Sequence, residues 1–306
     1  MFGLGSEYNY QEFTKTMMAK DLASSRMPDG PKPGQRAPEF DLRSLEGDLF
    51  RLKDFRGEKN VVITFGSATC PMTAGSIGGL NKLWKESGDE TQFVLIYVRE
   101  AHPGDKIPAH NTVGDKIRAA EILRGEEDVE MPILIDDLKG TVHRKYGKLP
   151  NSTYIIDKSG RVAFRAQWTE PGVVREALEQ LLAIERDRNV EHAVVLGGED
   201  KSMPMSYPAL YSYRALHRGG RKAILDFEHA LGLPGKMAVA SSRIIGPVAE
   251  NPGRTLIAAA LGAAVLTGGI YAGRALRRKR LAPRDPYQHY EPSAAEETDD
   301  YGVVGI

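Results

Sequence analysis

The residue best suited to chemistry is Cys70, the single cysteine of this 306-residue chain. It follows the apolar run VVITF at 61–65, which is typical of a strand buried on both faces, and it directly precedes Pro71. Proline is favoured in the first turn of a helix, so we expect the sulfur at a helix N-terminus. Unpaired N–H groups and the helix dipole favour the nucleophilic thiolate there. We therefore predict a reactive thiol rather than a buried structural one.

Two residues that can move protons follow a second apolar run. Glu100 and His102 come just after FVLIYV at 93–98, which is also expected to be a buried strand. If the two strands are parallel, their carboxyl ends share the sheet edge where open α/β sheets bind ligands. A histidine there can act as a general acid, and a glutamate can orient it. We therefore predict that Glu100 and His102 form a catalytic site with Cys70.

The elements that position these residues alternate between residues 33 and 188. Apolar runs predict strands, and apolar periodicity predicts helices, in this order: strand 61–65, helix 71–86, strand 93–98, helix 113–124, strands 131–136 and 152–157, and helix 172–187. The strand at 152–157 is followed by the turn KSG and a hairpin partner, RVAFRAQW. Strand–helix–strand, then a hairpin and a last helix, is the thioredoxin pattern. We predict an α/β, thioredoxin-like fold for residues 33–188.

Pro150 precedes one of these strands and is the next candidate for the site. A cis X–Pro bond is rare and usually serves a purpose, and in a thioredoxin-like fold a cis-proline at this position faces the active thiol. We predict that role for Pro150, with Pro132 as the competing candidate. His110 and His143 are expected at the surface, without a catalytic role.

Composition excludes several classes of protein. Lys and Arg together number 41, as do Asp and Glu, so the net charge is zero and nothing indicates a nucleic-acid partner. A single cysteine excludes an intrachain disulfide and a cysteine-rich metal site. We therefore expect no bound metal or cofactor, and a lone cysteine fits a reducing compartment.

The rest of the chain divides into four segments. They are a lead-in at 1–32 with a short helix over about 7–24, an extension of unknown role at 189–254 with one helix near 220–231, an apolar helix at 255–276, and a basic then acidic, disordered tail at 277–306. The stretch from Thr255 to Gly273 carries no charge and is followed by RALRRKR, which predicts a single-pass membrane anchor near the C-terminus. Its G-x-x-x-G pair is compatible with a homodimer.

The orientation of this anchor has two interpretations. The positive-inside rule places the basic cluster in the cytoplasm and the thioredoxin-like domain at 33–188 outside. The lack of a signal-like start at the N-terminus places this domain in the cytoplasm, which is the interpretation that we favour.

The motifs FGSATCP and YVREAHPGD together resemble the iodothyronine deiodinases, which carry selenocysteine in an FGS-x-T-U-P motif followed by Y-x-x-EAH. The resemblance continues through MPILIDD, TVHRKYGKLP and STYIID and covers about residues 33–185. It implies that Cys70 takes the place of the selenocysteine and that Glu100 and His102 are the family's Glu and His. Supporting positions of the motif fall on Ser67, Thr69 and Pro71.

Three departures from the family matter. Sulfur replaces selenium, and a thiol is slower to accept iodonium. Ala68 stands where the family has a nearby second cysteine, and Thr73 removes any C-x-x-C pair, so an external thiol such as thioredoxin or glutathione must restore Cys70. The apolar anchor is C-terminal here, whereas vertebrate deiodinases are anchored by their N-terminus.

These observations leave three hypotheses of function. The leading one is reductive dehalogenation of an iodothyronine-type small molecule, in which Cys70 attacks iodine and His102, steered by Glu100, supplies the proton. The second is a one-cysteine thiol peroxidase; Ser67, three residues before the thiol, favours it, and Ile63, where peroxiredoxins have proline, disfavours it. The third is a non-catalytic, membrane-tethered interaction module that uses residues 189–250 as its partner surface.

Overall fold

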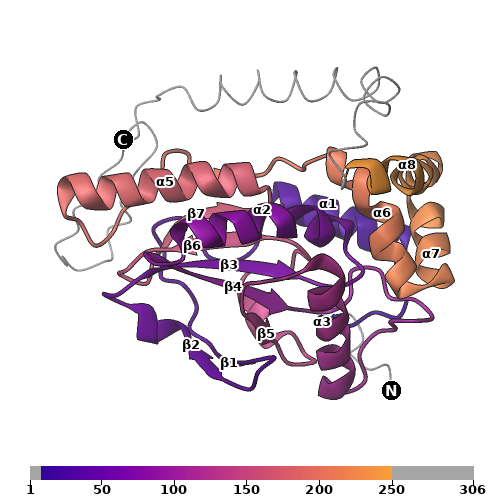
Figure 1. Ribbon diagram of the computed structural model, residues 1–306, viewed down its shortest axis with the longest axis horizontal. Coiled ribbons are helices and arrows are strands. Elements are labelled where there is room, and N and C mark those ends of the chain that lie inside the picture. The colour runs from indigo at the N-terminus through magenta and orange to yellow at the C-terminus, as the bar shows by residue number, and fades with distance from the viewer. Residues whose placement is uncertain (1–7, 250–306) are drawn as a thin grey trace.

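The chain folds around one eight-stranded sheet with helices on both faces (Figure 1). The computed structural model describes residues 8–249. The strand order is β2-β1-β5-β4-β3-β6-β7-β8. The strands are β1 (Asp41–Ser44), β2 (Leu49–Arg51), β3 (Asn60–Gly66), β4 (Thr91–Tyr97), β5 (Ile133–Ile135), β6 (Thr153–Ile156), β7 (Val162–Ala166) and β8 (Glu199–Asp200).

Two hydrophobic clusters lie on the two faces of the sheet. On β3, Val62 belongs to one cluster while Val61 and Ile63 belong to the other, as expected when successive side chains alternate between faces. The first cluster packs under α2 (Pro71–Ser87), α3 (Val113–Glu127) and α5 (Pro171–Arg188). The second packs under a 3₁₀ helix, η1 (Leu52–Phe55), and the short helix α4 (Thr141–Lys145). Covered on both faces, β3 is buried along its whole length.

The central strands have the predicted thioredoxin-like arrangement. β3 and β4 are parallel and joined through α2, β6 and β7 form an antiparallel hairpin, and α5 follows the hairpin. Their order in the sheet is β4-β3-β6-β7, and β5 adds a further parallel strand beside β4. The α/β, thioredoxin-like fold is therefore confirmed, and the carboxyl ends of β3 and β4 do share one edge.

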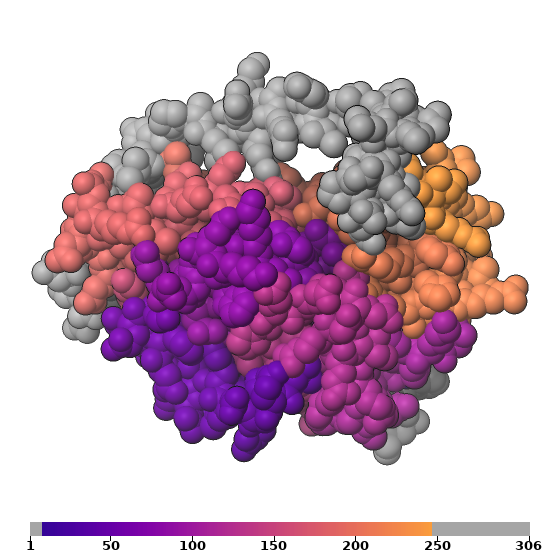
Figure 2. Space-filling view, in the orientation of Figure 1, coloured from indigo at the N-terminus to yellow at the C-terminus, as the bar shows by residue number. Residues whose placement is uncertain are grey.

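The extension forms more structure than the single helix expected near 220–231. It adds β8 to the sheet beside β7 and then forms α6 (Ser206–Gly219), α7 (Arg221–Leu231) and α8 (Leu233–Ala249). The lead-in helix, α1 (Lys15–Arg26), starts later than expected and packs against α7. Figure 2 shows α6–α8, in orange, seated against α3, in magenta. The two ends of the described chain thus meet beside the carboxyl ends of β3 and β4.

A pair of glycines permits this close packing. A Cβ atom added at Gly104 would lie 2.3 Å from the carbonyl oxygen of Gly219, at the end of α6. The loop after β4 and the α6–α7 junction therefore touch backbone to backbone, which a larger residue at Gly104 would prevent.

The predicted membrane segment at 255–276 and the tail at 277–306 lie outside the described residues. Within residues 8–249, none of the helices combines the length and the apolar character that a membrane span requires.

Candidate active site

Cys70 is the N-cap residue of α2, and Pro71 is the first residue of that helix, as predicted. The cysteine is buried, with 2% of its surface exposed. Burial raises the pKa of the Cys70 thiol above its ordinary value, and this outweighs the lowering by hydrogen bonds from Thr73 and from the backbone N–H of Met72. The expected net preference for the thiolate was wrong, because desolvation at this buried helix start exceeds the effect of the N–H donors.

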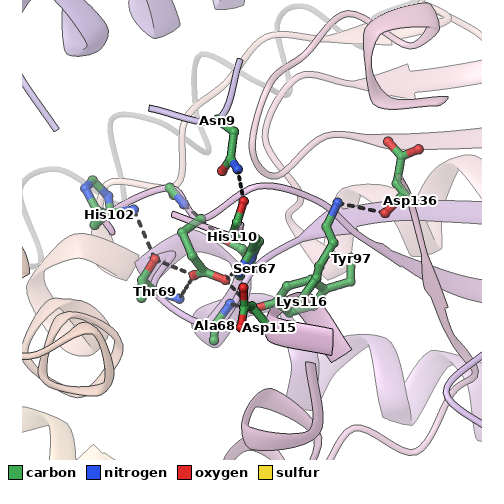
Figure 3. A network of polar contacts seen from close by, with 12 residues as sticks. Asn9, Ser67, Ala68, Thr69, Tyr97, His102, His110, Asp115, Lys116 and Asp136 are labelled. Atoms are coloured by element: carbon green, nitrogen blue, oxygen red, sulfur yellow. Dashed lines mark hydrogen bonds and ion pairs between the residues drawn. The ribbon is translucent and has the colours of Figure 1, made fainter. Parts of the chain in front are cut away.

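Glu100 is a buried acceptor that holds the loop before Cys70. Figure 3 shows Thr69, His102 and His110 in the polar network around it. Its Oε2 accepts hydrogen bonds from the backbone N–H of Thr69 at 3.0 Å and from the Thr69 hydroxyl at 2.6 Å. Its Oε1 accepts from the Tyr97 hydroxyl and lies 3.2 Å from Nε2 of His110. Burial alone would raise the pKa of Glu100, but His110, Thr69 and Tyr97 together hold it below its ordinary value. A buried carboxylate therefore fixes the residue directly before Cys70.

His102 lies in an aromatic clamp between the lead-in and the extension. Its ring meets Phe13 edge-on at 4.3 Å and Phe227 edge-on at 5.1 Å, measured between centroids. Its Nδ1 atom is buried and has no hydrogen-bond partner in the part of the chain that the structure describes. Burial lowers the pKa of His102 to about 3, with the nearby charge of Glu100 opposing. The imidazole is therefore neutral at neutral pH.

Glu100 does not orient the His102 ring directly, in contrast to the predicted arrangement. Glu100 binds the hydroxyl of Thr69, and that hydroxyl accepts the backbone N–H of His102 at 3.0 Å. The strand β4 ends at Tyr97, so the two residues lie in a loop and do not share the strand periodicity on which the prediction rested. Thr69 is the link between them.

Ser67 and Pro150 support the site in ways that the sequence left open. The Ser67 hydroxyl accepts the backbone N–H of Ala101 at 3.1 Å and so ties the loop after β4 to the loop after β3. Pro150 lines the cavity beside Cys70. Its predicted cis bond was wrong, since residues 8–249 contain no cis peptide.

Two histidines that were expected at the surface are buried. His110 is 4% exposed and lies beside Glu100, while His143 is fully buried, with its ring nitrogens 2.8 Å from the Tyr8 hydroxyl and 2.7 Å from the Leu149 carbonyl oxygen. No pattern in the sequence marks His110 or His143 as buried, because folding alone brings their partners to them. The only signal is that His110 follows the EAH motif by a few residues.

An apolar cavity of about 100 Å³ lies beside Cys70. Cys70, His102 and Trp168 come from the central fold, and the buried indole Nε1 of Trp168 has no hydrogen-bond partner among the described residues. The remaining lining is mostly apolar and comes largely from the lead-in and the extension: Phe13, Met18 and Leu22 from the lead-in, and Met203, Phe227 and Leu231 from the extension. Within residues 8–249 no cluster of three or more histidine, cysteine or acidic side chains is suited to a metal ion.

Comparisons with known proteins agree with this geometry. A family model described as iodothyronine deiodinase matches residues 13–182. The type I iodothyronine deiodinase of Xenopus laevis is 30% identical over 46% of this chain and 59% of its own length. The thyroxine 5-deiodinase of Gallus gallus is 29% identical over 41% of this chain and 52% of its own length. The chain thus spans somewhat more than half the length of these curated relatives.

Two of the solved structures with similarity to part of the chain carry the names of redox proteins. Peroxidoxin BcpB from Mycobacterium tuberculosis is 21% identical, covers 50% of this chain and 98% of that one, and gives a TM-score of 0.38. A thioredoxin-family thiol:disulfide interchange protein from Chlorobium tepidum is 16% identical, covers 49% and 97%, and gives a TM-score of 0.38.

Proposed function

Because the chain belongs to the iodothyronine deiodinase family, we propose that it is a thiol-dependent oxidoreductase that removes iodine from an iodinated aromatic compound. The observation that carries this proposal is the placement of the chain's one cysteine. Cys70 opens onto an apolar cavity that it shares with His102, and a ring nitrogen of His102 is buried without a partner. The apolar lining is suited to an aryl iodide, and a soft sulfur nucleophile is suited to a soft iodine atom.

The protonation states at rest suggest how the proton moves. Cys70 is a neutral thiol and His102 a neutral imidazole that lines the same cavity, and we propose that His102 relays the thiol proton as the sulfur attacks iodine. The S–I bond forms, the C–I bond breaks, and the imidazolium gives the same proton to the ring carbon. The balance is Cys–SH + Ar–I → Cys–S–I + Ar–H, which leaves a sulfenyl iodide on the protein and a reduced substrate.

Regeneration requires two thiols from outside the chain. Cys70 is the only cysteine, so no internal thiol can resolve the sulfenyl iodide. Two molecules of a reductant such as glutathione, or one dithiol such as thioredoxin, give Cys–S–I + 2 RSH → Cys–SH + RSSR + HI. We propose no bound metal or cofactor for this cycle.

The test is iodide release by the full chain in the presence of dithiothreitol. Thyroxine and 3,5-diiodotyrosine are the substrates, and Cys70→Ser and His102→Gln are the variants. We expect no release by Cys70→Ser and a kcat lower by roughly a hundredfold or more for His102→Gln, since positioned acid–base groups contribute about 10²–10⁴-fold. Circular dichroism of both variants controls for folding. Hydrogen peroxide is assayed in parallel, because Cys70-dependent peroxide turnover without iodide release would support the thiol-peroxidase hypothesis instead. Inactivity in both assays would favour the interaction module.

Attachment to a membrane is a separate proposal, which rests on the uncharged stretch from Thr255 to Gly273 and the basic cluster that follows it. Extraction of cell membranes with carbonate tests it. An anchored chain stays in the pellet, whereas a variant with three lysines placed within this stretch is released.

A further inference from the structure

One wall of the Cys70 cavity comes from a segment beyond the family match. The match ends at residue 182, while Met203, Phe227 and Leu231 lie in the extension. They line the cavity together with Phe13 and Met18 of the lead-in. The central fold supplies the thiol, and the lead-in and the extension supply much of the surrounding apolar lining.

The extension is held in place by contacts that leave it little freedom at the cavity. The backbone N–H of Lys106, in the loop after His102, donates to the carbonyl oxygen of Gly219 at 2.9 Å. The Asp105 carboxylate accepts the backbone N–H of Lys222, in the first turn of α7, at 2.8 Å. Arg218 of α6 forms a buried ion pair with Glu127 of α3 at 2.5 Å. The extension is therefore anchored at the base of α7, directly beside the site.

The volume of the cavity is small for a ligand with an aromatic ring. Its volume of about 100 Å³ is less than the roughly 150 Å³ of an engineered protein cavity that binds benzene. Pockets for drug-sized ligands measure about 300–1,000 Å³. A single ring requires only an adjustment of flexible side chains such as Met203. A second ring needs more room than this, and Met203 and Leu231, which are both partly buried, occupy part of the lining.

We propose that Met203 and Leu231 form a size filter over Cys70, which admits substrates with one aromatic ring and excludes the two-ring diphenyl ether skeleton of iodothyronines. The proposal rests on the proposed role of Cys70 as the nucleophile, and it narrows the substrate class to single-ring aryl iodides. The aromatic clamp on the His102 ring consists of Phe13 and Phe227, and neither Met203 nor Leu231 is one of those rings. They can therefore be changed without removing the clamp on His102.

The experiment measures access to Cys70 with three thiosulfonates of graded size in the full chain. The reagents are methyl, benzyl and 4-phenoxybenzyl methanethiosulfonate, and the last has the two-ring ether skeleton. The thiolate attacks the sulfenyl sulfur, an S–S bond forms, and methanesulfinate leaves. Labelling of Cys70 is followed by mass spectrometry. The rate for each reagent is divided by the rate at which the same reagent reacts with glutathione, which corrects for differences in intrinsic reactivity. Variants are Met203→Ala and Leu231→Ala, with Leu225→Ala, half exposed on the same helix as Leu231, as the matched control.

We expect the two-ring reagent to react at least about tenfold more slowly than the benzyl reagent after this correction, a difference of about 1.4 kcal/mol in barrier. Met203→Ala and Leu231→Ala should narrow that gap at least threefold, and Leu225→Ala should leave it unchanged. Equal corrected rates in the unaltered chain, a gap that neither cavity variant changes, or no reaction with even the methyl reagent would overturn the filter. Labelling does not depend on deiodination, so a size gap without iodide release would refute the proposed function and leave the filter standing.

Discussion

Replacing Thr69 with valine removes the hydroxyl group that links Glu100 to the backbone of His102. That hydroxyl donates to Glu100 at 2.6 Å and accepts the backbone N–H of His102 at 3.0 Å, and Thr69 is fully buried. Valine has the same shape, so the backbone and the packing have no steric reason to move. What changes is that Glu100 loses a donor and a buried N–H loses its acceptor.

The expected cost follows from these two losses. A hydrogen bond to a charged group contributes about 1.5–3 kcal/mol, and a buried donor left unpaired costs about 1–3 kcal/mol. The two effects share one atom and are not fully additive, so we expect Thr69→Val to lower the free energy of unfolding by about 3 kcal/mol. Thr69→Ser keeps the hydroxyl and loses one methyl group, for which about 1 kcal/mol is expected.

Urea unfolding followed by tryptophan fluorescence measures both values, since Trp84 and Trp168 lie in the described fold. Iodide release by the same samples measures the effect on the site, where we expect a loss with valine and near-normal rates with serine. A valine variant within about 1 kcal/mol of the unaltered chain would refute the proposed linkage through Thr69. The same conclusion would follow if serine destabilised the protein as much as valine.

Three further predictions concern charge and burial. Burial raises the pKa of Cys70, so its alkylation rate by iodoacetamide should keep rising with pH beyond the point where glutathione levels off; an earlier plateau would contradict this. Because the pKa of His102 is lowered to about 3, the unfolded chain binds more protons than the folded chain below about pH 6.5. The free energy of unfolding therefore decreases as the pH is lowered. Between pH 7 and pH 5 this residue should contribute a loss of about 2 kcal/mol in urea titrations, and a His102→Gln variant that loses as much as the unaltered chain would refute it. Glu127→Gln breaks the buried ion pair with Arg218 and should cost about 3 kcal/mol, whereas Glu130→Gln, at an exposed pair, should cost less than about 1 kcal/mol; equal effects would contradict the difference in burial.

The central fold was predictable because its signals are local. Each core strand is a short apolar run, and Pro71 marks the start of α2 directly after the cysteine, so the order of elements could be read along the chain. Two parallel strands then place Cys70 and His102 at one edge of the sheet, whatever the surrounding side chains are.

The environment of the site was not predictable in this way. Whether the helix start lowers the pKa of Cys70 depends on how much water reaches it. Part of the burial comes from the lead-in and from residues more than a hundred positions later in the chain. His110 is buried for a similar reason, since its contact with Glu100 exists only once the loop has folded back.

The sequence by itself determined the place of Cys70 at the start of a helix and the thioredoxin-like order of strands, since these depend on neighbouring residues and their periodicity. The tertiary structure decided that the thiol is protonated at rest, that Thr69 links Glu100 to His102, and that Met203 and Leu231 line the cavity. These features arise from desolvation and from contacts between distant segments, and neither is encoded in the pattern of any one segment.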